Sequence, residues 1–157
     1  MPNMRHDPHH QQHHGNTVDH HRKPHIMQKQ LINPWTWQAN FGYSQAVAVR
    51  HATETLYCAG QTSVDTDGIP VHEGDIGAQI AKALDNVETV LSEAGLGWDN
   101  VVRLNMYTTD IDGFLANYGV LASRLASTES APSSTLIGVQ RLAFPELLVE
   151  LEATAIR

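Results

Sequence analysis

The clearest alternation of apolar and polar residues lies at the C-terminal end of the chain, in residues 147–156. A period of two residues is typical of a half-buried strand. Its apolar face carries Leu147, Val149, Leu151, Ala153 and Ala155. Glu150 and Glu152 share the other face with Leu148 and Ile156. A carboxylate among apolar neighbours must be solvated, paired or used, because burying it alone is costly. Glu150 is therefore the first candidate for a functional residue.

Shorter strand patterns precede this one. Residues 32–37 predict an aromatic-rich turn, and the two strand patterns that follow it are separated by a short polar link, which predicts a hairpin. The predicted strands are residues 43–49, 55–61, 100–108, 136–139 and 147–156.

Two stretches carry apolar residues at helical spacing. The first follows Asp75 and ends at Gly95, which are residues typical of a helix start and a helix end. The second follows Asp110, another residue that favours a helix start. The apolar faces consist of Ile76, Ile80, Ala83, Leu84, Val87, Leu91 and Ala94 in the first helix, and of Ile111, Phe114, Leu115, Tyr118, Leu121 and Leu125 in the second.

The order of these elements, β-β-α-β-α-β-β, predicts an α+β domain with two helices on one face of a mixed sheet. Strand–helix–strand units imply crossover connections and some parallel pairing. Two helices cover only one face of such a sheet. The other face also carries apolar residues, and no element remains to bury it. We therefore expect a homo-oligomer with pockets at the subunit boundaries.

Composition narrows the class of protein. A chain of 157 residues with 41% hydrophobic and 17% charged residues is typical of one globular domain. The formal net charge of −7 disfavours nucleic-acid binding. No apolar run is long enough to span a membrane or to form a signal core, so we expect no membrane partner and a cytoplasmic location. The single cysteine, Cys58, excludes an intrachain disulfide and is expected to be a small buried residue.

Residues 1–27 differ from the rest, because they hold all but two of the ten histidines and almost no apolar residues. They predict a disordered leader, followed by a single domain over residues 28–157. Neighbouring imidazoles chelate zinc, nickel or copper, which makes His9, His10, His13 and His14 a candidate metal site. The alternative is a leader without function. The domain itself shows no cofactor motif, and none is expected.

Several short motifs stand in a fixed order along the domain. They are Gly42-Tyr43-Ser44-Gln45, Tyr57-Cys58-Ala59-Gly60-Gln61, Gly74-Asp75, Glu93-Ala94-Gly95, Asn100-Val101-Val102-Arg103, Tyr107-Thr108-Thr109-Asp110, Pro132 and Val149-Glu150-Leu151-Glu152-Ala153. Taken together, over nearly all of residues 32–157, they resemble the Rid (YjgF-type) family of enamine/imine deaminases, some of which were labelled endoribonucleases. The resemblance implies a chorismate-mutase-like fold and a homotrimer with its sheets packed inward and three clefts between subunits.

The resemblance also implies roles for individual residues. Glu150 stands at the position of the glutamate that directs water onto a C=N carbon. The implied substrate-binding residues are Tyr43, Ser44, Gly60, Ser134, Thr135 and Leu136. Active members carry an arginine within a Pro-Ala-Arg-Ser run, and Ser134 replaces it here. A serine lacks the charged fork that binds a carboxylate through two hydrogen bonds, so the preference for 2-imino acids should change.

Two functions of different classes stay open. One is a trimeric hydrolase acting on small enamines, imines or related carbonyl compounds, and the other is a non-catalytic metabolite-binding trimer. In the second case Glu150 would be a solvated or ion-paired strand residue and Tyr43 an interface aromatic. A ribonuclease is a remote third hypothesis, because the chain is acidic and shows no basic patch.

Overall fold

The structure is a computed structural model, and it describes residues 26–157. The predicted histidine-rich leader therefore lies outside the described residues, apart from residues 26 and 27. The same holds for its candidate metal ligands His9, His10, His13 and His14. Within residues 26–157 no helix is long and apolar enough to cross a membrane.

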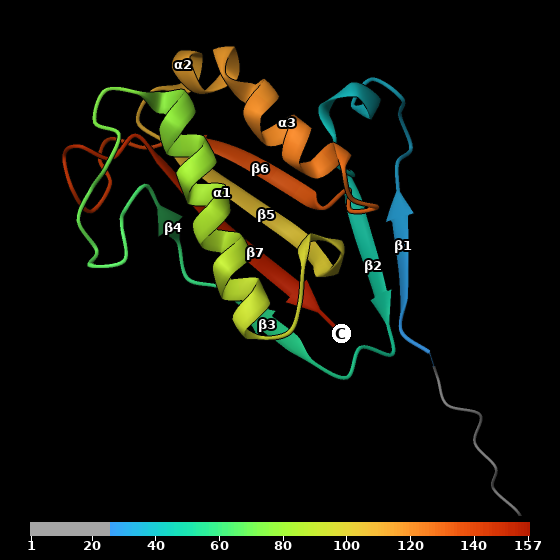
Figure 1. The fold of residues 1–157 in the computed structure, drawn as a ribbon. Helices are drawn as coiled ribbons and strands as arrows, with labels where there is room; N and C mark the ends of the chain where they lie inside the picture. The colour runs from blue at the N-terminus through green and yellow to red at the C-terminus, as the bar shows by residue number, and fades with distance from the viewer. Residues whose placement is uncertain (1–25) are drawn as a thin grey trace, which may run out of the picture.

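One mixed sheet forms the centre of the fold (Figure 1). Its strands, in spatial order, are β3 (Thr55–Tyr57), β7 (Val149–Ile156), β5 (Val101–Thr108) and β6 (Ser133–Gly138), and the short β4 (Gln61–Thr62) also pairs with β7. β5 and β6 run parallel, whereas β7 is antiparallel to each of its neighbours. A parallel pair needs a crossover, and here helices provide it. The predicted α+β fold with a mixed sheet is confirmed.

Three helices lie on one face of this sheet, namely α1 (Ile76–Glu93), α2 (Ile111–Ala116) and α3 (Tyr118–Ala126) (Figure 1). The predicted starts are correct, since Asp75 Oδ1 accepts from Ala78 N and Asp110 Oδ1 accepts from Gly113 N, each at 2.9 Å. The second predicted helix is interrupted at Asn117. The Asn117 side-chain amide donates to the carbonyl of Gly113 at 2.9 Å, and such local bonds compete with the helical ladder.

The hydrophobic core lies between the helices and the sheet. The alternating face predicted for β7 is its centre, with Leu151 and Ala155 both fully buried. Burying a leucine side chain contributes about 1.5–3 kcal/mol. From α1 the core takes Ile80, Ala83, Leu84, Val87 and Leu91, and from the other helices Phe114, Leu121 and Leu125. The apolar faces predicted from the sequence therefore meet in this core, except that Leu115 of the second predicted helix is exposed.

The first two strands form a separate two-stranded ribbon, which lies beside the main sheet (Figure 1). β2 (Ala46–Arg50) pairs antiparallel with β1 (Gln28–Ile32), whereas β3 pairs with β7. The predicted hairpin between residues 43–49 and 55–61 is therefore wrong, because the first of these strands pairs with the preceding strand β1 and the second with the distant strand β7. One isolated bridge, between Ser44 and Ser133, links the start of β2 to β6.

The sheet face opposite the helices has no covering element among residues 26–157 (Figure 1). The strand register places on this uncovered face the side chains of Tyr57, Arg103, Asn105, Tyr107, Thr135, Ile137, Glu150, Glu152 and Thr154. The face is mixed in character. Tyr57 is 79% exposed and Ile137 44% exposed, while the Asn105 amide donates to Glu152 Oε1 at 2.8 Å.

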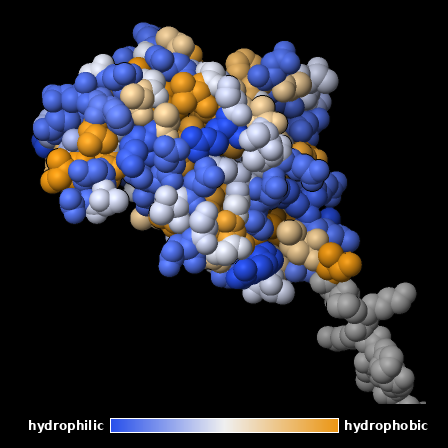
Figure 2. Space-filling view, in the orientation of Figure 1, coloured by the Kyte–Doolittle hydropathy of each residue, from blue (hydrophilic) through white to orange (hydrophobic). Residues whose placement is uncertain are grey.

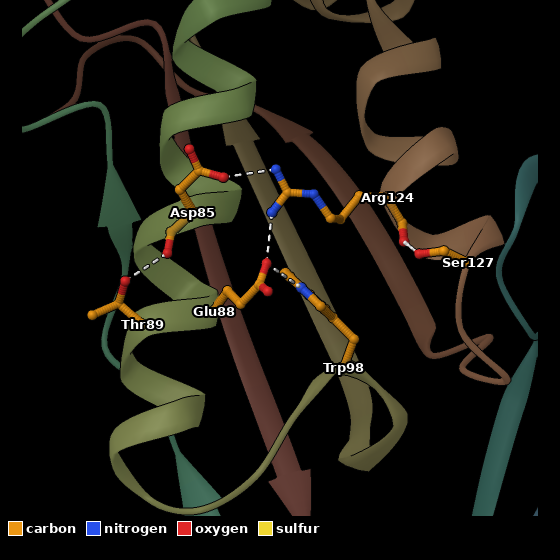
Figure 3. A network of polar contacts seen from close by, with 6 residues as sticks. All are labelled: Asp85, Glu88, Thr89, Trp98, Arg124 and Ser127. Carbon is orange, nitrogen blue, oxygen red and sulfur yellow. Dashed lines mark hydrogen bonds and ion pairs between the residues drawn. The ribbon is translucent and has the colours of Figure 1, made fainter.

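A polar network on the outside ties α1 to α3 (Figure 3). Arg124 donates to Asp85 Oδ1 and to Glu88 Oε2, each at 2.7 Å. Burial alone would lower the pKa of Arg124, but the hydrogen bonds and charges of the two carboxylates outweigh it and raise the pKa. Hydrophilic residues predominate on the face seen in Figure 2, where apolar residues occur in small separate groups.

Candidate functional site

A cavity of about 490 Å³ opens between the edge of the sheet, the α2–α3 pair and the segment before β2. This volume lies within the range of small-molecule sites. Its lining residues are Phe41, Tyr43, Met106, Leu115, Tyr118, Ser134 and Leu136. Three of them, Tyr43, Ser134 and Leu136, are substrate-binding residues predicted from the sequence. We call this space the aromatic cavity.

The floor of the aromatic cavity comes from the register of two parallel strands. Ser134 pairs with Leu104 and Leu136 pairs with Met106, so all four side chains share the helix-covered face. Leu104 is fully buried in the core, which fixes that orientation. The Ser134 hydroxyl donates to the carbonyl of Pro132 at 3.4 Å, a long bond that leaves its oxygen free to accept another.

The walls of the aromatic cavity are rings from two segments far apart in sequence. The short 3₁₀ helix η1 (Ala39–Phe41) ends at Gly42, whose φ of +71° suits glycine and turns the chain toward β2. The Tyr118 hydroxyl donates to the carbonyl of Phe41 at 2.6 Å, which joins α3 to this segment. Burial, with a smaller contribution from nearby Tyr43, raises the pKa of Tyr118. Tyr118 therefore stays a neutral phenol at neutral pH.

Glu150 lies on the opposite, uncovered face, directly across from Tyr107 in the β5–β7 register. Its carboxyl group rests against Gly60, since a Cβ added to that glycine would meet Glu150 Oε1 at 1.8 Å. Glu150 is half-buried, and its carboxyl group makes no hydrogen bond or ion pair with any residue in the range 26–157. Its neighbour Glu152, by contrast, accepts the Asn105 amide. Gly60 is thus the residue that leaves room for the unpaired carboxylate.

The remaining predicted residues lie near these two groups. Thr135 is on the uncovered face, where its hydroxyl accepts from Arg103 Nη2 at 2.5 Å. Ser44 is buried, its backbone N–H donates to Pro132 O at 3.1 Å, and its hydroxyl has no partner within the described part of the chain. A single chain therefore brings together Tyr43, Ser134 and Leu136, and separately Glu150 with Gly60. The sheet stands between the two groups.

Sequence reasoning assigned other lining residues to the core. Leu115 and Tyr118 belong to the apolar face predicted for the second helix. No sequence pattern around them indicates that they line a cavity. Phe41 precedes the Gly42 turn, which was the one available hint. Cys58 is buried as expected, and burial raises the pKa of its thiol, so it is a poor nucleophile. No group of three or more His, Cys, Asp or Glu side chains within residues 26–157 is arranged to hold a metal ion.

The chain is similar to known proteins over most of its length. The model of the family described as Endoribonuclease L-PSP matches residues 36–157. A RutC family protein of Synechocystis is 32% identical over 115 residues, which is 73% of this chain and 85% of the relative. Among solved structures, a protein of unknown function of the conserved Rid family from Yersinia pestis has a TM-score of 0.74 and 34% identity, over 82% of this chain and 98% of that one.

A member of the highly conserved YjgF family from Mycobacterium tuberculosis has a TM-score of 0.58 and 30% identity, over 83% of this chain and all of that one (100%). The family model begins after β1, so it includes every element that forms the main sheet and both groups of predicted site residues. The sequence motifs, the fold and these matches agree, and the chain belongs to the Rid (YjgF-type) family, whose model carries the description Endoribonuclease L-PSP.

Proposed function

We propose that the chain forms a homotrimer that binds small metabolites in clefts between subunits and hydrolyses reactive enamines, imines or related small carbonyl compounds. The observation that carries this proposal is the half-buried carboxyl group of Glu150, which lies against Gly60 and has no partner among residues 26–157. A carboxylate in such a place is destabilising unless water or a ligand satisfies it. Glu150 is thus available for chemistry in a way that the paired Glu152 is not.

The chemistry requires water to attack the carbon of a C=N bond. In the proposed mechanism Glu150 accepts a proton from that water as the C–O bond forms and delivers it to the nitrogen, which gives a carbinolamine. Glu150 then takes the hydroxyl proton of the carbinolamine and passes it to the nitrogen as the C–N bond breaks, which leaves a carbonyl compound and ammonia or an amine. A positioned carboxylate of this kind contributes roughly 10²–10⁴-fold to the rate.

The position of Ser134 supports an altered substrate preference. We expect from the motifs that it stands where active members have an arginine, and in this structure it lies among apolar and aromatic side chains. A serine hydroxyl provides one hydrogen bond, whereas a guanidinium provides two together with a charge. We therefore expect weaker turnover of 2-imino acids than of uncharged imines.

Association of chains is part of the proposal, because the sheet separates Glu150 from the aromatic cavity within one chain. We propose that Glu150 of one copy faces the aromatic cavity of another. Sedimentation velocity of the full chain should give a species of three times the 17.3 kDa mass. The variant Ile137→Asp should dissociate it, since it would place a charge on a face that association covers.

The exposed residue Phe144 belongs to the loop between β6 and β7 and to no strand of that face, so Phe144→Asp provides the matched control, which should remain trimeric. A full chain that stays monomeric at micromolar concentration would refute the assembly.

Turnover is tested with freshly generated imines. The expected result is release of ammonia and a carbonyl compound faster than in buffer, from 2-aminoacrylate and, to a greater extent, from neutral imines. Coupled assays for ammonia and for the carbonyl product measure both halves of the reaction. If neither the acidic nor the neutral imines react faster than in buffer, the hydrolase proposal fails.

The second candidate function is a non-catalytic metabolite-binding trimer. The observation that favours it is the same separation of Glu150 from the aromatic cavity, together with the serine at position 134, where the resemblance to active members leads us to expect an arginine. Ligand binding without any turnover, by a protein that is trimeric, would establish it in place of the hydrolase.

A further inference from the structure

We infer that the aromatic cavity accepts an uncharged, planar apolar group, so that the ligand is a neutral aromatic imine or carbonyl compound and not a 2-imino acid. This inference rests on the proposed function in one respect, namely that the aromatic cavity is the substrate site. It adds the chemical class of the substrate, which the arrangement of rings and the absence of charge in the lining determine.

The lining is almost wholly apolar. Its members are aromatic or aliphatic except for Ser134, and none of the described residues that line it is acidic or basic. Apolar pockets with one or two polar groups bind through burial of apolar area, and the polar groups fix orientation. The Ser134 hydroxyl, which retains accepting capacity, could orient a carbonyl hydrate or an N–H group.

The rings are arranged to contact another ring. Phe41 and Tyr118 meet edge to face, with their centroids 6.4 Å apart and an interplanar angle of 69°. Tyr43 makes a similar contact with Trp37, at 6.4 Å and 67°. Aromatic side chains prefer such tilted contacts, which stabilise a pair of rings beyond the area that it buries. An aromatic ligand would extend this set of rings, whereas a short aliphatic acid would contact few of them.

A ligand carboxylate would find no countercharge among the described residues that line the aromatic cavity. Arg103 is adjacent to Leu104, the strand partner of Ser134, but it projects to the opposite face and donates to Thr135. The Tyr118 hydroxyl already donates to the carbonyl of Phe41. A carboxylate buried without a cation or enough donors is strongly disfavoured. The aromatic cavity therefore discriminates against acids.

The rim is also apolar. Phe41 is 48% exposed and Leu115 53% exposed, and Trp37, which contacts Tyr43, is 60% exposed. Large apolar side chains that gather at the opening of a cavity mark a binding surface. The rim is therefore apolar, like the lining of the aromatic cavity.

The test compares two probes of similar shape, indole and indole-3-acetate, by isothermal titration calorimetry with the full chain. Indole should bind at least tenfold more tightly than the acid.

Leu136→Trp and Leu115→Trp fill the aromatic cavity from two different elements, and each should weaken indole binding at least tenfold. Phe144→Trp adds the same side chain in a second cavity, the one beside Arg141, and should leave indole binding unchanged. Ser134→Arg should reverse the preference by favouring the acid.

Equal affinity for the two probes, or indole binding that survives both Leu136→Trp and Leu115→Trp, would overturn the inference. The outcome is independent of turnover, because neither probe contains a C=N bond that the protein could hydrolyse. Indole binding by a protein that hydrolyses no imine would refute the hydrolase and support this inference. Turnover that is fastest on 2-imino acids would support the hydrolase and overturn this inference.

Discussion

Replacing Glu150 with glutamine is expected to lower the turnover of the best imine substrate by about 10²–10⁴-fold, because an amide cannot accept the proton of the attacking water. The fold should be unaffected, since the Glu150 carboxyl group makes no hydrogen bond or ion pair among residues 26–157. Ammonia release under saturating substrate measures the loss. Thermal unfolding of the same preparation shows whether the protein is intact.

The matched control is Glu152→Gln, which removes the same charge two residues along the same strand face. Glu152 accepts the Asn105 amide, and a glutamine oxygen can replace that acceptor, so turnover should change little. Gly60→Ala gives an independent second variant. Its new Cβ would displace the flexible end of Glu150 at small cost to stability, and turnover should fall as it does for Glu150→Gln. Equal turnover by the wild type and Glu150→Gln would end the catalytic assignment.

Replacing Gln79 with leucine should lower the free energy of unfolding by about 3–5 kcal/mol, because it leaves buried backbone groups without partners. Gln79 is fully buried in the first turn of α1. Its amide nitrogen donates to the carbonyls of His72 (3.2 Å) and Glu146 (2.8 Å), and its oxygen accepts the Leu148 N–H at 2.7 Å. One side chain thus holds the loop before α1 and the segment that leads into β7. Urea unfolding followed by circular dichroism measures the change.

The control for this prediction is Gln140→Leu, the same substitution at an exposed position of the loop after β6. Surface changes of this kind are usually within about 0.5 kcal/mol. All variants are compared at one protein concentration, because association would make unfolding concentration-dependent. A loss below about 1 kcal/mol for Gln79→Leu would show that water or a shifted backbone satisfies the three groups.

Helices and strands with a clear periodicity of apolar residues were predictable from the sequence, whereas the pairing of the strands was less so. The helix after Asp75 and the strand at residues 149–156 follow from spacing alone, since their apolar faces form the core. The sequence does not predict β1, because Gln28–Ile32 shows no apolar alternation. This strand is stabilised by its antiparallel pairing with β2. The pairing of β3 with β7 depends on residues about 100 positions away, and no local pattern encodes it.

The candidate site divides in the same way. The family motifs predict five site residues, namely Tyr43, Ser134, Leu136, Glu150 and Gly60. In the structure the first three line one cavity, and Glu150 contacts Gly60. Which face each occupies depends on register, because a shift of one residue reverses every side chain of a strand. That register follows from the β5–β6 and β5–β7 pairing, so the sequence could not indicate that Ser134 and Glu150 lie on opposite faces.

The ribbon of β1 and β2 contributes nothing to the buried core of the described domain, and one bridge at Ser44 joins it to β6. Phe41 and Tyr43, which form a wall of the aromatic cavity, stand immediately before this ribbon. A tilt of the ribbon that changed the distance between that wall and Leu136 would have to break the hydrogen bond from Tyr118 to the Phe41 carbonyl, which ties the wall to α3. Ligands thicker than the present cavity should therefore be excluded, so the site should select by size as well as by charge.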